Sequence, residues 1–114
     1  MAIPSGSGTE VLKRYTRNSL SNGTITAITG VANHIYTILS IIICENGDAA
    51  ENISISMNDG SNQIDLVYNA PIPAYGTYIF NDKFVISGTD TLLIRSHAAS
   101  ALDIIVSYID QDWT

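Results

Sequence analysis

Apolar and polar side chains take turns along much of the chain, which is the pattern of a strand with one face in the core and one in water. The clearest case is the run Ile53, Ser54, Ile55, Ser56, Met57 and Asn58. Residues 35–44 differ, because they are apolar apart from Thr37 and Ser40. A strand of that kind is buried on both faces, or it presents its second face to another subunit.

Turn-forming residues such as Asn, Asp, Gly and Pro separate these segments about every ten residues. The β-branched residues Ile, Val and Thr make up 33 of the 114 residues, which favours strands over helices. We expect strands at residues 24–29, 35–44, 52–58, 63–68, 77–80, 84–87, 91–96 and 102–110. The pattern predicts an all-β fold, a single antiparallel β-sandwich of about eight strands that is jelly-roll-like.

The first 20 residues break this pattern and begin with a segment rich in Ser and Gly. We interpret residues 1–20 as an extended, flexible N-terminal arm and residues 21–114 as the sandwich domain. The candidate partner-binding residues of the arm are Glu10, Val11, Leu12, Lys13, Arg14, Tyr15 and Arg17. Two interpretations remain open: an arm that docks on an acidic neighbour, or an exposed edge strand whose Lys and Arg residues block aggregation.

Composition sharpens the picture toward one domain that assembles. Hydrophobic residues make up 46% of the chain and charged residues 14%, which excludes a disordered chain. Globular domains carry about 25% charged residues, so this surface has few charges. The net charge is −6 with five Lys and Arg in all, which argues against a nucleic-acid partner. From Asn18 on there are ten acidic and two basic residues, so this part has a net charge of −8. The segment before it is basic.

Targeting and redox features are few. The chain has no apolar run approaching the roughly 20 residues of a spanning helix, so we expect no membrane partner. Its beginning lacks the basic and apolar regions of a secretory signal, and we expect synthesis in a cytoplasm. Cys44 is the single cysteine, which excludes an intrachain disulfide.

Catalysis finds little support in the residue pattern. His34 and His97 lack the spacing of paired metal ligands, and no Gly-x-Ser-x-Gly motif lies between a strand and a helix. Cys44 follows three Ile residues and is expected to be a buried, unreactive thiol. Loop carboxylates such as Asp59 resemble calcium ligands only weakly, since the regular calcium-loop spacing is missing. We therefore expect no enzyme activity, no metal and no cofactor.

Aromatic residues offer a second set of interface candidates. Tyr and Trp are frequent at interfaces because they combine an apolar body with a polar tip. The candidates are Tyr75, Tyr78, Tyr108 and Trp113. A sugar-binding platform is the alternative, although no acidic and aromatic residues cluster in the sequence.

The order of motifs over about 80 residues resembles small structural proteins of tailed bacteriophages. A long apolar strand ends in Cys44-Glu45-Asn46, and Pro71-Ile72-Pro73, Gly76-Thr77, Ser87-Gly88-Thr89-Asp90 and a closing Val106-Ser107-Tyr108 follow it. The resemblance implies a β-sandwich without catalytic residues that resides in the virion after synthesis in the host cytoplasm. It implies a capsid decoration (cement) protein that binds the assembled shell as an oligomer, commonly a trimer.

The partners implied by this resemblance are further copies of the chain and the major capsid protein or other virion proteins. The alternatives are a tail, neck or fibre-attachment protein, or a carbohydrate-binding or adhesin module.

Overall fold

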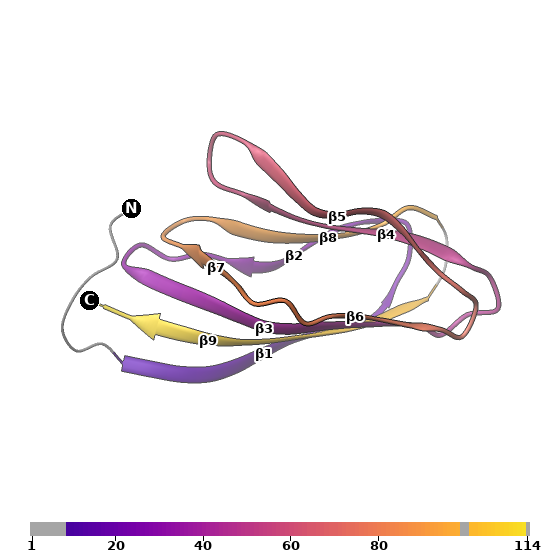
Figure 1. Cartoon of the computed structure of the whole chain (residues 1–114), viewed down its shortest axis with the longest axis horizontal. Helices are drawn as coiled ribbons and strands as arrows, with labels where there is room; N and C mark the ends of the chain where they lie inside the picture. The colour runs from indigo at the N-terminus through magenta and orange to yellow at the C-terminus, as the bar shows by residue number, and fades with distance from the viewer. Residues whose placement is uncertain (1–8, 99–100, 114) are drawn as a thin grey trace.

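Two antiparallel sheets pack face to face in the computed structural model, which describes residues 9–98 and 101–113 (Figure 1). Short strands rich in β-branched residues follow one another, each ended by a turn. The strands are β1 (Thr9–Leu20), β2 (Gly23–Thr29), β3 (His34–Glu45), β4 (Glu51–Asn58), β5 (Gln63–Ile72), β6 (Thr77–Phe80), β7 (Phe84–Ser87), β8 (Thr91–Ser96) and β9 (Leu102–Asp112). No helix of the described residues is long and apolar enough to cross a membrane.

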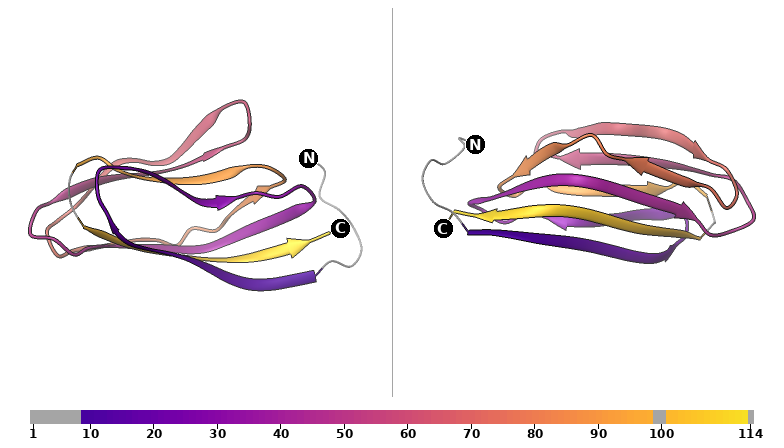
Figure 2. Two further views of the ribbon diagram at one scale, coloured as in Figure 1. Left: turned by 180° about the vertical axis from the view of Figure 1, so that it is seen from behind. Right: turned by 60° about the horizontal axis from the view of Figure 1, so that its bottom comes forward.

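The strand order is that of a jelly roll. One sheet has the order β1-β9-β3-β6, with β7 also paired to β3, and the other has the order β2-β8-β4-β5. Apart from the β4–β5 hairpin and the β6–β7 step, each strand is followed by one in the opposite sheet. Figure 2 shows both layers from behind and from below. The predicted all-β, jelly-roll-like sandwich is confirmed, with nine strands in place of about eight.

Strand boundaries agree closely with the sequence pattern in the second half of the chain. The expected strands at 77–80, 84–87 and 91–96 are β6, β7 and β8 with unchanged bounds. β5 is longer than expected, since it runs on through Asn69 and Pro71 to Ile72. A proline is tolerated there because β5 is an edge strand.

The N-terminal segment differs from the expected arm. Residues 9–20 form β1, which pairs with β9 from Thr9 opposite Asp112 to Leu20 opposite Leu102. Leu20 is buried and Tyr15 packs against the core, so this segment belongs to the sandwich. The sandwich therefore includes residues 9–20, which were expected to belong to the arm, and β1 is an edge strand, the second of the two interpretations of this segment. Residues 1–8 of the expected arm lie outside the described residues.

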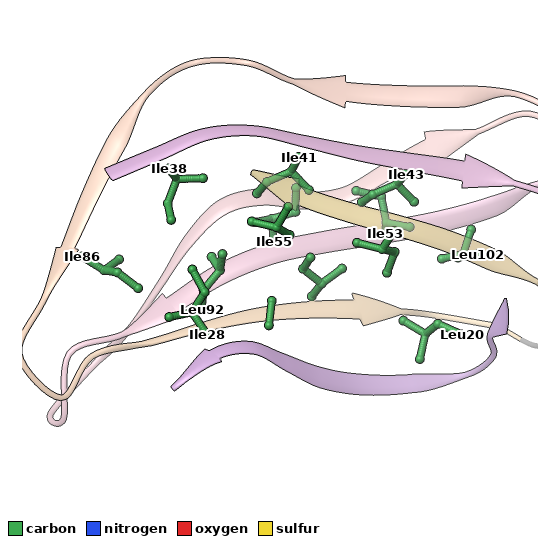
Figure 3. Close-up of a cluster of buried hydrophobic side chains, with 14 of the residues drawn as sticks. Leu20, Ile28, Ile38, Ile41, Ile43, Ile53, Ile55, Ile86, Leu92 and Leu102 are labelled. Carbon is green, nitrogen blue, oxygen red and sulfur yellow. The ribbon is translucent and has the colours of Figure 1, made fainter. Parts of the chain in front are cut away.

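The core is made mainly of isoleucine and leucine side chains from both sheets (Figure 3). Ile38, Ile41 and Ile43 of β3 face Ile53 and Ile55 of β4 across the interior, and all five are fully buried. Replacing one such Ile with Ala typically costs about 2–5 kcal/mol of stability.

One sequence expectation fails on β4. Ser54 and Ser56, expected to face water, are only 6% and 5% exposed. The Ser54 hydroxyl is enclosed by His97 and by the backbone of Asn69, and it is hydrogen-bonded to both.

Candidate functional site

The outer face of the five-stranded sheet is unusually apolar for a surface turned to water. β3 lies in the middle of this sheet, and its inward side chains fill the core. Its outward side chains continue the apolar character, as the run from 35 to 44 predicts. We call this surface the apolar face, and its members are Leu12, Leu39, Ile42, Ile79, Val85, Ile105 and Ile109.

The strand register arranges these side chains in rows across the sheet. In one row Ile105 of β9 lies opposite Ile42 of β3, which lies opposite Ile79 of β6. Side chains directly opposite one another in a sheet are in contact distance, so this row forms a continuous apolar ridge. Ile79 is 59% exposed and Ile105 43% exposed, so two members of the ridge are largely open to solvent.

A second row runs parallel to the first. Leu12 of β1 lies opposite Ile109 of β9, which lies opposite Thr37 of β3, and Thr37 lies opposite Val85 of β7. Leu12 is 72% exposed. Large exposed apolar patches on a protein domain mark sites of interaction with another protein or a membrane.

Two hollows lie on the apolar face. The register between β3 and β9 shifts at Leu39, and this bulge places Leu39 beside Leu12 and Arg14 at a hollow of about 470 Å³. A second hollow of about 340 Å³ lies around Ile42, Cys44 and Ile105. Rows of protruding side chains with hollows beside them allow a partner of complementary shape to pack against this face.

The candidate residues of the N-terminal segment divide between two sides of β1. Leu12 and Arg14 lie at the apolar face, while Tyr15 turns toward the core. Lys13 forms an ion pair with Asp110. The others are exposed on the edge strand, namely Glu10, Val11 and Arg17. The structure thus brings part of this segment to the apolar face, where it stands beside residues of β3, β6, β7 and β9 that the sequence did not single out.

The aromatic candidates do not gather at one surface. Tyr78 and Tyr108 pack against the core, and Tyr108 meets Tyr36 edge to face at 6.1 Å. Tyr75 is 71% exposed in the β5–β6 turn, beside Gly47 at the end of β3. Trp113 lies near the opposite end of β3, where its backbone N–H donates to the Asn33 carbonyl.

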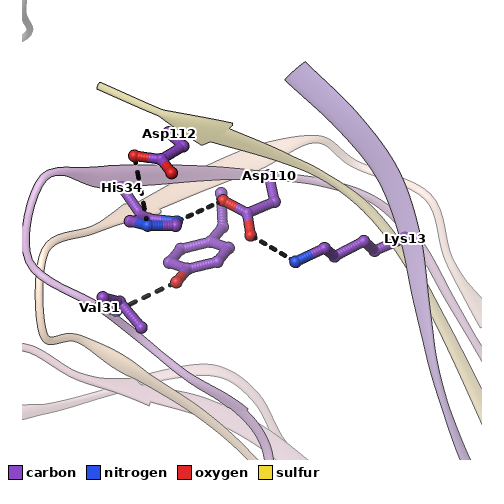
Figure 4. Close-up of polar contacts among 6 residues, drawn as sticks. Lys13, Val31, His34, Asp110 and Asp112 are labelled. Carbon is purple, nitrogen blue, oxygen red and sulfur yellow. Dashed lines mark hydrogen bonds and ion pairs between the residues drawn. The ribbon is translucent and has the colours of Figure 1, made fainter. Parts of the chain in front are cut away.

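A polar cluster ties the edge strand β1 to the two central strands β9 and β3 (Figure 4). Asp110 is 6% exposed and binds Lys13 Nζ at 2.8 Å through Oδ2 and His34 Nδ1 at 2.7 Å through Oδ1. His34 Nε2 lies 3.5 Å from Asp112 Oδ1, so both ring nitrogens face carboxylates. The neighbouring Tyr36 accepts a hydrogen bond from the Val31 N–H. We interpret the cluster as contacts that hold β1 on its sheet, because Lys13 of β1 pairs with Asp110 and both nitrogens of His34 face carboxylates.

The charges of this cluster change how Asp110 titrates. Burial acts to raise the pKa of Asp110, but the hydrogen bonds and charges of Lys13 and His34 outweigh burial and hold that pKa below its ordinary value. The same hydrogen bond to Asp110 raises the pKa of Lys13. A carboxyl group whose pKa is lower in the folded state stabilises that state above its ordinary pKa, and this contribution is lost as the pH falls through the folded pKa.

Asp110→Asn should therefore destabilise the protein in a pH-dependent way. At pH 7 we expect a loss of about 1–3 kcal/mol in the free energy of unfolding, from the charge-assisted hydrogen bonds. Urea unfolding at pH 7 and at pH 3 measures it, and the gap between variant and parent should shrink at pH 3. Asp82→Asn, at an exposed position between β6 and β7, serves as the control. An equal gap at both pH values would show that the charge of Asp110 contributes nothing.

Cys44 differs from its expected burial. It is half-buried, beside the second hollow, and belongs to the outward series of β3 with Ile42. Within the described part of the chain, no three His, Cys, Asp or Glu side chains gather as a metal site would require.

Comparisons with solved structures find similar folds in chains of low sequence identity. No family model matches the sequence, and no curated protein matches it either. A chain in the structure of infectious bursal disease virus, Gx strain, has a TM-score of 0.58 and 10% identity, over 94% of this chain and 32% of that chain. This chain thus spans about a third of the viral chain.

Two further structures differ in how much of the other chain is matched. A chain from Bacillus endospore appendages, described as a novel family of disulfide-linked pili, has a TM-score of 0.53 and 14% identity, over 100% of this chain and 97% of that chain. A pentameric capsid protein from metagenomic phage sequences is a weaker match, with a TM-score of 0.45 and 19% identity over 86% of this chain and 61% of that chain. At these identities the first two matches, with TM-scores above 0.5, show the fold alone. Fold and surface together define a jelly-roll domain with one apolar outer face.

Proposed function

We propose that this chain is a non-enzymatic structural protein of a virus particle, a capsid decoration (cement) protein that binds the assembled shell as an oligomer and stabilises it. The observation that carries the proposal is the apolar face. Its rows of Ile, Leu and Val side chains cover the outside of a sheet whose inner side is already a complete core. Such a surface gains stability when a partner removes it from water, at about 25 cal/mol per Å².

On a repeating shell, an oligomer can bind stably even when the contact surface of each copy is modest. A stable interface buries about 1,600 Å² in total, and a set of smaller contacts made by one oligomer adds avidity. Copies of the chain meet through the apolar face in this proposal, most simply as a trimer, and the oligomer contacts the major capsid protein. The basic residues Arg14 and Arg17 on the exposed edge strand favour contact with an acidic neighbour such as the body of another copy.

The likeness to a chain in a virus structure supports the virion part of the proposal at the level of the fold. The motif order, which resembles that of small structural proteins of tailed bacteriophages, supports the phage part. A tail, neck or fibre-attachment role uses the same apolar face and differs only in the particle component that is contacted.

A second candidate function is a subunit of an extracellular fibre. The match to the endospore appendage chain favours it, because the two chains correspond over nearly their whole lengths. A fibre subunit needs head-to-tail contacts that do not close, whereas a decoration protein forms closed rings.

The shape of the purified oligomer separates the two candidates. Light scattering after size exclusion measures the mass in solution, and electron microscopy of the same sample shows the form. We expect a closed oligomer, most simply a trimer. Open filaments would support the fibre subunit instead, and a monomer at high protein concentration would contradict both. Localising the chain in a map of the particle then tests the position on the shell.

A further inference from the structure

The outer face of the four-stranded sheet carries a small polar pocket that plays no part in the proposed assembly. The pocket has a volume of about 140 Å³, and the side chains that matter for its chemistry are Ser54, Ser56, Gln63, Asp65, Tyr68 and Arg95. They come from β4, β5 and β8. Pockets for drug-sized ligands measure about 300–1,000 Å³, so this one has room for a single small ring.

Strand β5 is deformed where it borders the pocket. The register between β4 and β5 shifts twice, on either side of the pairing of Ile55 with Val67. Asn69 adopts a φ of 56°, in the left-handed region that a non-glycine residue rarely enters. Figure 1 shows the β4–β5 hairpin rising away from the sandwich. Bulges of this kind re-aim side chains and are frequent beside binding sites.

Hydrogen bonds hold this deformation in place. The Asn69 N–H donates to Ser54 Oγ at 3.0 Å, and Asn52 Nδ2 donates to the Asn69 side-chain oxygen at 3.1 Å. Ser54 Oγ also bonds His97 Nε2 at 2.7 Å, and the His97 ring meets the Tyr68 ring edge to face at 6.2 Å. Unusual backbone conformations persist only where the surroundings fix them. As a result, Tyr68 is 69% exposed at the pocket, and the His97 ring packs against its ring.

The polar groups of the pocket are available for a ligand. Within residues 9–98 and 101–113, the Arg95 side chain makes no ion pair or hydrogen bond, although Asp65 lines the same pocket. Among the same residues, the Asp65 carboxylate accepts a single long hydrogen bond, at 3.5 Å from Gln63 Nε2. Ser56 is almost buried, yet its hydroxyl is bonded to none of the described residues. The pocket thus offers donors in a fork, an acceptor carboxylate and groups that do both.

We propose that this pocket binds one pyranose unit of a glycan. A sugar ring presents neighbouring hydroxyls, which need both donors and acceptors, and an apolar ring face, which an exposed Tyr ring can cover. A phosphate or sulfate group alone would meet the Asp65 carboxylate as well as Arg95. An apolar ligand would leave the polar groups of Arg95 and Ser56 without partners, at a cost in affinity.

The pocket lies on the opposite sheet from the apolar face. Glycan binding is therefore independent of the proposed function. The two are geometrically compatible, because docking through the five-stranded sheet leaves the four-stranded sheet turned outward.

Nuclear magnetic resonance on the full-length protein tests the site. The probes are the methyl pyranosides of glucose, galactose, mannose, N-acetylglucosamine and N-acetylneuraminic acid, each titrated separately. At least one should shift the backbone amide signals of Ser54, Ser56 and Arg95 in a saturable manner. If none of the five sugars shifts these amides, the assignment of the pocket is overturned.

Two exposed residues of the pocket provide variants that leave the fold intact. Tyr68→Ala and Arg95→Gln should each raise the Kd for that sugar by about tenfold or more, which corresponds to about 1.4 kcal/mol. The matched controls are Tyr75→Ala, whose ring is 71% exposed outside the pocket, and Arg14→Gln on the other sheet. The controls should keep the parent Kd, and a control that loses binding as strongly as the pocket variants would place the sugar elsewhere. Since self-association is measured separately, failure here leaves the assembly proposal standing.

Discussion

A protein with Lys in place of both Ile42 and Ile105 should stay folded and lose its self-association. The two side chains lie opposite each other on β3 and β9 at the centre of the apolar face. In the isolated domain both positions lie on an outward side of the sheet, so a Lys there can extend into water. Strand preference at such positions varies within about 1 kcal/mol, which a domain of ordinary stability tolerates.

In the assembled state the same two changes have a large effect. A charged group buried at the centre of an interface without a partner loses its hydration, and central residues often contribute 2 kcal/mol or more each. The sum for two positions corresponds to a loss of association of about 1,000-fold, at 1.4 kcal/mol for each factor of ten. Light scattering over a concentration series measures the shift toward monomer.

Ile64→Lys is the matched control for this experiment. Ile64 is 45% exposed, close to the 43% of Ile105, but it lies on β5 in the opposite sheet. This variant should associate like the parent protein. Cys44 provides a second readout, because it belongs to the apolar side of β3 and is half-buried in the single chain. Its labelling by a thiol reagent should be slow in the oligomer and fast in the double variant. Parent-like association of the double variant would exclude the apolar face as the interface.

Most of the fold was predictable because its signals are local. Alternation along β4 and β9, and turn residues between short strands, depend on neighbours in the sequence and survive any tertiary arrangement. The apolar run of residues 35–44 predicted a strand with two apolar faces, and β3 is such a strand at the centre of its sheet. The jelly-roll-like class followed from the number and spacing of the strands, whereas their order in the two sheets is seen only in the structure.

The edge strand β1 was harder to predict because its stabilising contacts are remote in sequence. Nearly all side chains of Thr9–Leu20 are exposed, so the segment shows no buried face by which alternation could reveal a strand. Its place is fixed by pairing with β9, about 90 residues away, and by the Lys13–Asp110 ion pair. The basic residues looked like a docking feature, whereas one of them fastens the strand to its own sandwich.

The polar pocket was out of reach for a related reason. Tyr68 and Asp65 are close in sequence, but Arg95 and Ser56 join them only through the β4–β8 and β4–β5 pairings. The register shifts that turn Tyr68 outward have no sequence signature of their own, because Asn69 in β5 reads as an ordinary polar residue. A site whose residues are brought together by the pairing register of neighbouring strands can be found only when that register is known.

Deleting residues 1–17 should destroy the stable fold, which is the opposite of what a detachable arm predicts. The deletion removes most of β1 and its ladder with β9, takes the Tyr15 ring from the core and leaves Asp110 without Lys13. Each loss costs on the order of 1 kcal/mol or more, against a total stability of about 5–15 kcal/mol for domains in general. The uncovered edge of β9 is apolar at Ile105 and Ile109, which favours aggregation.

Circular dichroism and a urea titration measure the outcome for the deleted chain. The control is the full-length chain with Lys13→Gln, Arg14→Gln and Arg17→Gln, which removes the charges and keeps the strand; it should unfold cooperatively with only a modest loss of stability. A synthetic peptide of residues 9–20, added to the deleted chain, should restore part of the native signal by pairing with β9. A deleted chain that unfolds cooperatively within about 1 kcal/mol of the parent would instead establish this segment as an arm that can leave its own sandwich and exchange between copies.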